Sequence, residues 1–186
     1  MTTLPYRELL SGDAPHKALM KKKPRRGGRN AFGRITTRHQ GGGHKRRLRD
    51  VDFKYDKKNI PAKIETIEYD PFRSAFIGLA LYRDGERRYV IVPKEVKVGD
   101  SFIVAHDAPL TVGNRLPLGS IPVGTFIYNI ELSPGAGAAL VRSAGNFAEV
   151  VAHDAGYTQV KLPSTEIRKI SDLAWASIGT VGNEEY

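Results

Sequence analysis

The stretch AFIGLALYRDGERRYVIV, residues 75–92, contains the clearest pair of strands in the chain. Ala75 to Tyr82 is apolar on both faces, and Arg87 to Val92 is a second run of strand-forming residues. Between them, Asp84-Gly85 is suited to the positive φ angles of a tight turn. The sequence therefore predicts an antiparallel β-hairpin.

Further strand-like runs precede and follow this hairpin. Residues 62–69 alternate between apolar and polar, with a change of phase between Ile64 and Ile67 that a β-bulge would produce, and Asp70-Pro71 ends the run. Residues 95–105 predict a short strand pair around Gly99-Asp100, and residues 107–117 indicate a connector between domains.

The second half of the chain repeats this style. Residues 124–132 alternate like a strand, and residues 147–152 and 157–162 flank a turn at residues 153–156. No convincing amphipathic helix occurs between these runs. Short strands separated by Gly and Pro favour an all-β fold, which we expect to be two small β-barrels in tandem.

The charge of the chain is concentrated at its N-terminal end. Residues 1–60 contain 17 Lys and Arg against 5 Asp and Glu, whereas residues 61–186 contain 12 against 15. The first block therefore has a net charge of +12 and the second a net charge of −3. A focused cationic segment binds nucleic acid by neutralising phosphates, which makes the affinity fall steeply with salt. RNA is the expected polyanion.

Most of this charge lies in RRGGRNAFGRITTRHQGGGHKRRLR, residues 25–49, which has few apolar side chains. We expect it to be irregular and to take its order from the polyanion. Arginine can grip phosphate oxygens, and glycine lets the backbone approach RNA closely. The candidate RNA-binding residues here are Arg25, Arg26, Arg29, Arg34, Arg38, His39, Gly41, Gly42, Gly43, His44, Lys45, Arg46, Arg47 and Arg49. The alternative is a solvated tail, but such a tail has little need of Phe32 or of so many glycines.

Two further groups are candidate RNA contacts. Arg142, Ser143, Gly145 and Asn146 belong to a polar turn that could let RNA lie against the second barrel, and an ordinary structural turn is the alternative. Arg87 and Arg88 follow the hairpin turn and are equally well explained as RNA contacts or as solvated strand charges. Most aromatic residues fall at apolar strand positions, which favours core packing over base stacking.

Nothing in the chain specifies a reaction, a metal or a cofactor, and we expect it not to be an enzyme. The absence of cysteine excludes disulfides and cysteine-ligated zinc. His39 and His44 lack a completing ligand set, and the alternating Asp50 and Asp52 are better explained as ion-pair partners than as a magnesium site. The longest apolar run is strand-sized, so a membrane role is not expected.

Four stretches carry a resemblance to a known family: residues 27–54, 67–94, 118–132 and 137–152, with GGGH, DGERRY and SAG in the expected order. Together they span nearly the whole chain, which resembles the large-subunit ribosomal protein two family. The resemblance implies a basic extension over residues 1–45, an OB-fold over 46–108 and an SH3-like barrel over 109–186. It also implies binding to large-subunit rRNA and to other ribosomal proteins, with a structural role in assembly and near the peptidyl transferase region.

The C-terminal end differs from this family pattern. Members continue past the equivalent of Val181-Gly182-Asn183 into a basic tail with a histidine-containing loop, whereas this chain ends at Glu184-Glu185-Tyr186. The expectation is a short product, a removed tail, or a tail supplied by a separate polypeptide. We expect a cytoplasmic ribosome, with an organellar one as the alternative. Competing functions are a single-strand-binding or factor-like module that acts in trans and, more distantly, a nuclease.

Overall fold

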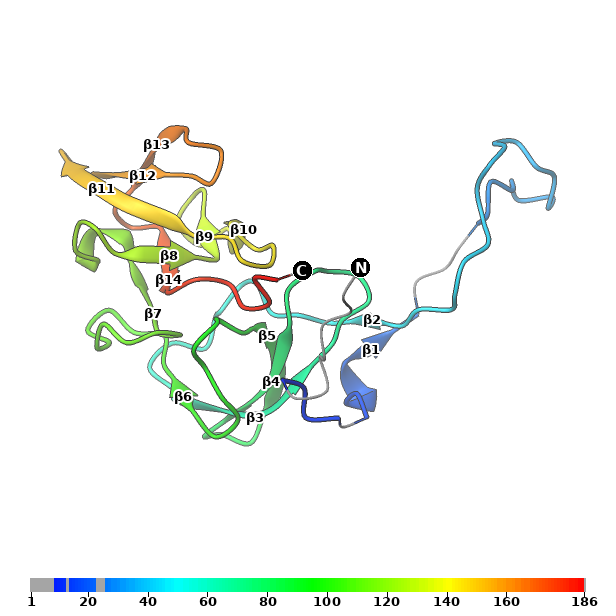
Figure 1. Ribbon diagram of the computed structural model, residues 1–186, viewed down its shortest axis with the longest axis horizontal. Coiled ribbons are helices and arrows are strands. Elements are labelled where there is room, and N and C mark those ends of the chain that lie inside the picture. The colour runs from blue at the N-terminus through cyan, green and yellow to red at the C-terminus, as the bar shows by residue number, and fades with distance from the viewer. Residues whose placement is uncertain (1–8, 13, 23–25, 186) are drawn as a thin grey trace.

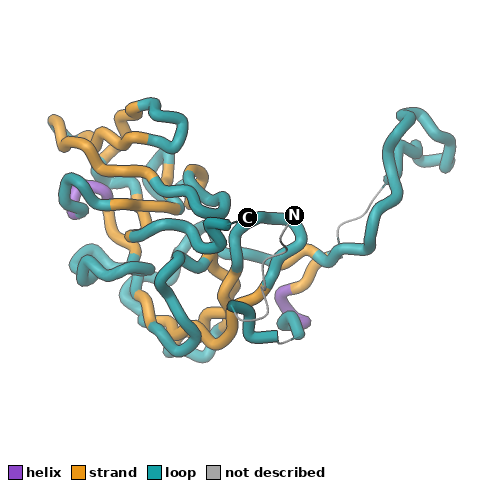
Figure 2. Tube along the Cα trace, in the orientation of Figure 1, coloured by secondary structure: helices purple, strands orange, loops and turns teal. Residues whose placement is uncertain are grey.

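The computed structural model describes residues 9–12, 14–22 and 26–185. In these residues the regular structure consists of short strands and two single-turn 3-10 helices, η2 (Lys17–Leu19) and η3 (Leu118–Ser120). Figures 1 and 2 show two β-rich bodies in contact and an irregular arm that projects from the first. The predicted all-β class is confirmed: an OB-fold is followed by an SH3-like barrel.

The first body is an antiparallel sheet with the strand order β5-β4-β3-β6. Its strands are β3 (Ala62–Glu68), β4 (Ile77–Tyr82), β5 (Arg87–Ile91) and β6 (Ser101–Phe102). The β3–β4 register shifts between Ile64 and Thr66, which confirms the predicted β-bulge. Val51 adds a parallel bridge to Tyr89 of β5. The core of this body includes Ile64, Phe76, Tyr82, Val90 and Phe102.

The hairpin of β4 and β5 is confirmed, with a three-residue loop instead of a two-residue turn. The Tyr82 N–H donates to the Glu86 carbonyl oxygen at 2.9 Å, and the Gly85 N–H donates to the Tyr82 carbonyl oxygen at 2.9 Å. Gly85 has a φ of +87°, but Asp84 is not left-handed, and its Oδ1 accepts the Glu86 N–H at 3.2 Å. The prediction of a positive φ at Asp84 is wrong because this loop type needs only one left-handed residue.

The second body is a six-stranded sheet with the order β13-β12-β11-β8-β14-β7, together with a separate β9–β10 pair. Its strands are β7 (Arg115–Pro117), β8 (Phe126–Tyr128), β9 (Ile130–Glu131), β10 (Ala138–Leu140), β11 (Ala148–Asp154), β12 (Tyr157–Lys161), β13 (Ile167–Ser171) and β14 (Trp175–Ile178). Its core includes Leu118, Ile127, Val150, Val160 and Ile178. The predicted β11–β12 hairpin is confirmed and turns at Ala155-Gly156, with φ angles of +46° and +85°.

Three strand predictions need correction. Residues 95–98 form turns, in which Asp100 Oδ2 accepts the Lys97 N–H at 2.8 Å, and β6 pairs with β3. The predicted connector at 107–117 ends in β7, which pairs with β14. The run at 124–132 is divided into β8 and β9 by Asn129, whose φ is +49°. In the first two cases, the pairing strand is distant in sequence, so local patterning cannot identify it.

The two bodies are joined by a buried polar network around Arg115 of β7. Arg115 Nη2 lies 3.1 Å from Glu131 Oε1, and its Nη1 donates to the Asn129 carbonyl oxygen at 2.5 Å. The Arg115 guanidinium also lies 4.6 Å from the ring centroid of Tyr55, which belongs to the first body. Asn129 Nδ2 donates to the Tyr55 hydroxyl at 3.0 Å. Burial raises the pKa of Tyr55 to about 12, so this hydroxyl stays neutral.

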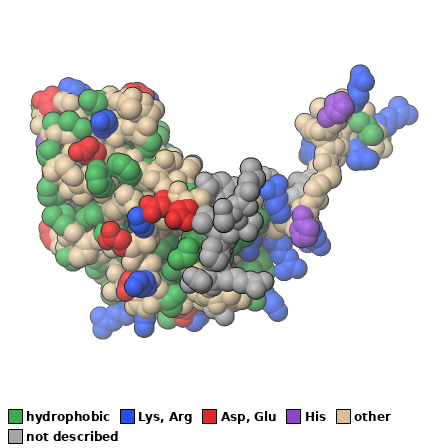
Figure 3. All heavy atoms as spheres, viewed as in Figure 1, with side chains coloured by type: hydrophobic (Ala, Val, Ile, Leu, Met, Phe, Trp, Pro, Cys, Tyr) green, Lys and Arg blue, Asp and Glu red, His purple; other side chains and the backbone are tan. Residues whose placement is uncertain are grey.

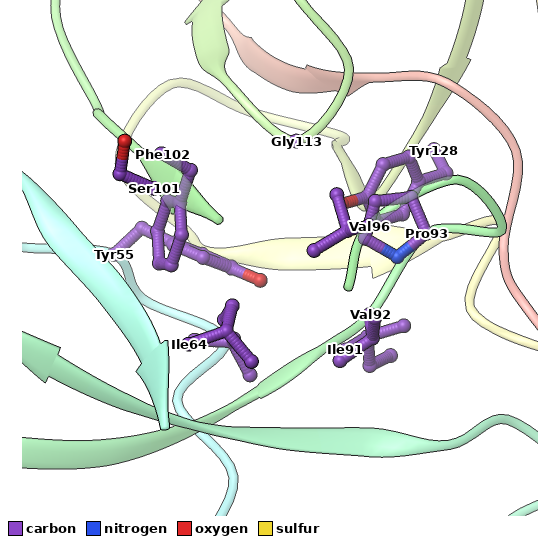
Figure 4. Close-up of a pocket in the computed structure, with 11 residues that line it drawn as sticks. Tyr55, Ile64, Ile91, Val92, Pro93, Val96, Ser101, Phe102, Gly113 and Tyr128 are labelled. Atoms are coloured by element: carbon purple, nitrogen blue, oxygen red, sulfur yellow. The ribbon is translucent and has the colours of Figure 1, made fainter. Parts of the chain in front are cut away.

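The C-terminal segment returns to the first body, beside β5 (Figure 1). Pro93 forms an antiparallel bridge with Val181, and the Gly182 N–H donates to the Val92 carbonyl oxygen at 3.1 Å. A cavity of about 20 Å³ is lined by residues of both bodies, including Tyr55 and Tyr128 (Figure 4). It has room for about one water molecule. The division at residues 108 and 109 remains a prediction.

Candidate nucleic-acid interface

Residues 26–47 form an arm that leaves the first body between two short strands, β1 (Met20–Lys21) and β2 (Leu48–Arg49). These strands pair antiparallel, with Met20 opposite Arg49 and Lys21 opposite Leu48. The arm is therefore closed at its base, and it extends well away from the two bodies (Figure 1). The sequence did not predict this two-residue ladder, which is too short to produce a periodic pattern.

The cations described in the arm are exposed to solvent. Figure 3 shows Lys and Arg side chains along the arm and at its base, whereas the acidic side chains in view lie on the bodies. Within the described ranges, no carboxylate oxygen lies within 4.0 Å of a cation between residues 26 and 47. At the base, Lys21 pairs with Asp50 at 2.7 Å. Arg25 lies outside the described residues. The predicted contacts on the arm are Arg26, Arg29, Arg34, Arg38, His39, Gly41, Gly42, Gly43, His44, Lys45, Arg46 and Arg47, and Arg49 follows in β2.

The glycines let the two legs of the arm come close together. A Cβ added to Gly41 would lie 3.6 Å from the Cα of Gly27. Gly41, Gly42 and Gly43 have φ angles of +114°, +68° and +73°, which glycine adopts at little cost. Near these glycines lies an open hollow of about 640 Å³, which Arg26 and Arg46 also line. A cationic hollow of this kind suits a phosphate group.

The arm is not wholly irregular, which corrects the expectation that it depends on a polyanion for all its order. Residues 28–37 form a small hairpin in which the Gly28 carbonyl oxygen accepts the Thr36 and Thr37 N–H groups at 2.8 and 3.1 Å. A Cβ at Gly28 would lie 2.1 Å from the Thr37 carbonyl oxygen, so only glycine fits there. Arg29 and Ile35 form an antiparallel bridge above it. Backbone hydrogen bonds, not apolar burial, hold this turn together.

Three arginines at the junction of the arm and the bodies lie over aromatic rings. Arg46 Nη1 donates to the Pro71 carbonyl oxygen at 3.1 Å, and its guanidinium lies 5.0 Å from the Phe72 ring centroid. Next to it, the guanidinium groups of Arg73 and Arg142 lie 5.4 and 4.6 Å from the ring centroid of Phe53. Arginine over an aromatic face is held in place by the ring, and Arg46 and Arg142 have no carboxylate within 4.0 Å among the described residues.

Arg73 is the residue in this cluster that sequence reasoning missed. It pairs with the buried Asp70 at 2.7 Å, which positions it beside Phe53. The available signal was an arginine in a Pro-containing loop between two strong strands, two residues after Pro71. A cation in such a loop is equally common on any protein surface, so the signal is weak without the fold.

The predicted turn at residues 142–146 is held by hydrogen bonds to other parts of the chain. The Ala144 N–H donates to Ser74 Oγ at 3.1 Å, and the Gly145 N–H donates to the Val181 carbonyl oxygen at 3.2 Å. Gly145 has a φ of +67°, and a Cβ there would lie 3.1 Å from the Cα of Glu184. Arg142 and Ser143 are exposed, whereas Gly145 and Asn146 are half-buried. These contacts explain the turn residues structurally, and their role in RNA binding remains a prediction.

Arg87 and Arg88 are paired with carboxylates of the first body. Arg87 Nε and Nη2 donate to the two oxygens of Glu65 at 2.7 and 3.0 Å. This hydrogen bonding lowers the pKa of Glu65. Arg88 contacts Asp52 at 2.9 Å, Glu86 at 2.7 Å, and also Asp56. Although burial lowers the pKa of Arg88, the hydrogen bonds to these carboxylates raise it well above its usual value. Both arginines thus have structural ion pairs, and their role in RNA binding remains a prediction.

Most of the residues considered as metal ligands have other partners in the structure. Asp50 pairs with Lys21 and Asp52 with Arg88, which confirms the ion-pair interpretation. His44 Nδ1 lies 3.0 Å from the Lys45 carbonyl oxygen. Across the part of the chain that the structure describes, no group of three or more His, Asp or Glu residues could hold a metal ion. Likewise, none of the described helices is long and apolar enough to cross a membrane.

Two β-barrels and a projecting cationic arm define a structural class: small all-β domains that carry a basic extension. Comparison with family models identifies the particular family. Residues 16–104 match "Ribosomal Proteins L2, RNA binding N-terminal domain", and residues 111–186 match "Ribosomal Proteins L2, C-terminal domain". The chain belongs to the ribosomal protein L2 family.

Two curated relatives come from Buchnera aphidicola subsp. Acyrthosiphon pisum, strains Tuc7 and 5A. Each is named "Large ribosomal subunit protein uL2" and is 52% identical to this chain over 179 residues, which cover 96% of the chain. The chain spans 65% of the length of each relative.

Proposed function

We propose that the chain is a structural component of the large ribosomal subunit that binds large-subunit rRNA. In this role, residues 1–45 form the RNA-binding extension, and the domains at 46–108 and 109–186 anchor it on the RNA surface. It contacts neighbouring ribosomal proteins, catalyses no reaction itself, and resides in the ribosome of the cytoplasm or of an organelle. The comparisons do not support a separate polypeptide for the tail, and it forms no part of this proposal.

One observation carries the proposal: among the described residues, no carboxylate oxygen lies within 4.0 Å of an Arg or Lys nitrogen of the arm. On the bodies, Arg87, Arg88 and Arg115 are neutralised by Glu65, Asp52 and Glu131, whereas the arginines described in the arm are exposed to solvent. Segregated positive charge of this kind raises the local concentration of a polyanion and gives a steep salt dependence. Family membership makes large-subunit rRNA the expected polyanion.

Filter binding to large-subunit rRNA over a salt series tests the proposal. We expect the Arg46→Ala/Arg47→Ala variant to lower the magnitude of the log–log salt slope by about 0.7 to 0.9 for each phosphate that it no longer neutralises. The matched control is Arg168→Ala/Lys169→Ala, which removes the same charge from β13 on the second body. Equal slopes for the wild type and the Arg46/Arg47 variant, or a salt-insensitive wild type, would contradict the proposal.

Sedimentation distinguishes an assembly component from a factor that acts in trans. A stably integrated component stays at one copy per large subunit through a high-salt wash, because its arm contacts many phosphates at once. A largely soluble pool after that wash would favour the factor-like alternative.

A further inference from the structure

The hairpin at the end of the arm presents one aromatic side chain, Phe32, at its apex. Phe32 is 89% exposed, and Ile35 in the same turn is 63% exposed. A single exposed apolar side chain is common on protein surfaces and by itself implies nothing. What distinguishes Phe32 is the hydrogen-bonded turn that supports it and the charge that surrounds it.

The turn is organised by the side chain of Asn30. Asn30 Oδ1 accepts the N–H groups of Phe32 and Arg34, each at 3.0 Å. The Gly33 N–H donates to the Asn30 carbonyl oxygen at 3.1 Å, and the Asn30 N–H donates to the Arg34 carbonyl oxygen at 3.0 Å. Gly33 has a φ of +77°, which glycine adopts at little cost.

These hydrogen bonds decide what the apex can offer to a partner. The N–H groups of Phe32, Gly33 and Arg34 all donate inside the turn, so they are not available to cradle a phosphate. The apex therefore offers side chains: the ring of Phe32 and the exposed Arg34 of the same turn, whereas the Arg29 guanidinium turns back toward the Gly27 carbonyl oxygen. The backbone under the ring is already fixed, so binding through the ring loses less conformational entropy than binding through a flexible tail.

The chemistry around the ring selects the partner. Residues 26–49 contain eight Arg and Lys and no Asp or Glu, which favours a polyanion over a neutral or cationic surface. Among polyanions, RNA also presents flat apolar faces, because bases in loops and bulges can be unstacked and exposed. An aromatic ring stacks on any such base.

We propose that Phe32 stacks on an unpaired base of RNA while Arg34, in the same turn, contacts a neighbouring phosphate. This inference rests on the proposed RNA-binding function and adds a contact that electrostatics alone does not provide. It divides the arm into two parts: legs that contribute charge, and an apex that contributes stacking. Stacking is not weakened by salt in the way that phosphate contacts are.

The test uses the full chain and large-subunit rRNA, with dissociation constants measured over a salt series. We expect Phe32→Ala to weaken binding about 5- to 100-fold at every salt concentration and to leave the salt slope unchanged. Phe32→Leu, which keeps an apolar side chain without a ring, should lose most of the same affinity. Arg34→Ala should instead flatten the slope by about one unit. The control is Tyr157→Ala on β12, which removes an aromatic ring that is 52% exposed on the second body and should change neither quantity.

A fluorescence measurement reports on the ring itself. Phe32→Trp should keep most of the affinity, and its added emission should be quenched when RNA binds, because indole stacks on a base. The native Trp175 is buried and provides a constant background.

The outcomes separate this inference from the proposed function. If the wild type binds RNA with a steep salt slope and Phe32→Ala or Phe32→Leu binds equally well, the stacking contact does not exist and the proposed function stands. If the emission of Phe32→Trp is unchanged on saturation with RNA, the ring lies away from a base and the inference is overturned, even if affinity falls. If the wild type does not bind RNA, the proposed function fails first.

Discussion

The arm and the barrels use arginine for opposite purposes. On the barrels, Arg88 contacts three carboxylates and Arg115 is buried against Glu131, so these charges hold the fold together. On the arm, Arg29, Arg34 and Arg38 are exposed. The difference arises from the distribution of Asp and Glu along the chain, because arginine itself is charged in both places. A count of arginines therefore says little about RNA binding until their carboxylate partners are known.

The largest expected effect comes from breaking the buried pair. Arg115→Met should lower the free energy of unfolding by about 3–5 kcal/mol, because it leaves the Glu131 carboxylate buried without its partner. Urea unfolding measures this. Arg115→Met/Glu131→Met should recover much of the loss, since the unpaired charge is gone. A decrease below about 1 kcal/mol in the single variant would mean that the Arg115–Glu131 pair contributes little to stability.

A smaller effect is expected in the arm, on RNA affinity alone. Gly28→Ala places a Cβ against the Thr37 carbonyl oxygen at a φ of +69°, which should disrupt the hairpin that supports Phe32. Left-handed strain alone costs about 1–2 kcal/mol, so we expect RNA affinity to fall about tenfold or more while the melting temperature stays unchanged. Gly33→Ala is the matched control, because its φ is +77° but nothing lies within 4 Å of its Cβ. Equal effects of the two variants would show that crowding at Gly28 is unimportant.

Arg142 combines a structural contact with a predicted RNA contact. A double-mutant cycle can measure how much the structural contact contributes to stability. Its contact with Phe53 should couple Arg142→Ala and Phe53→Leu by about 0.5–1 kcal/mol in unfolding free energy. If Arg142 also contacts a phosphate, Arg142→Ala should flatten the salt slope by about 0.7 to 0.9. If the losses of unfolding free energy in the two single variants add up in the double variant, Arg142 and Phe53 do not stabilise each other. If the salt slope of RNA binding is unchanged, the role of Arg142 is structural only.

The smallest effect should appear on acidification. Hydrogen bonds from Arg87, Arg88 and Lys57 lower the pKa values of Glu65, Asp56 and Asp84 below their unfolded values, which are about 4. Stability from a lowered pKa is present above the unfolded value and is lost as the pH falls through the folded one. Unfolding free energy should therefore be flat from about pH 6 to 8 and decline below about pH 4 to 5. Glu65→Gln should make this decline shallower, and an identical decline would exclude the Arg87–Glu65 pair as a source.

Local patterning predicted the elements whose partners are close in sequence. The β4–β5 and β11–β12 hairpins and the bulge in β3 follow from alternation and turn residues. By contrast, β6 pairs with β3 and β7 with β14, and no local signal identifies such distant partners. The type and order of the barrels followed from the family resemblance, since alternation alone does not distinguish an OB-fold from other small barrels.

The same limit applies to the site. Glycine and arginine composition located the arm, but the carboxylates around Arg88 come from before β3 and from the hairpin loop, so its pairing is visible only in the fold. Arg73 was missed for the corresponding reason: its place beside Phe53 depends on where two loops meet. The charge on a residue is evident from sequence, whereas its partner is a property of the tertiary structure.

The ladder between β1 and β2 has a consequence for assembly. Because Met20 and Lys21 pair with Arg49 and Leu48, the arm is a doubled loop that is pinned at both ends. It has no free end of its own to pass through an opening, so it enters a crevice only with its tip leading, and the crevice must be two chains wide. An opening that is too narrow for both legs could receive the arm only by forming around it after it is seated.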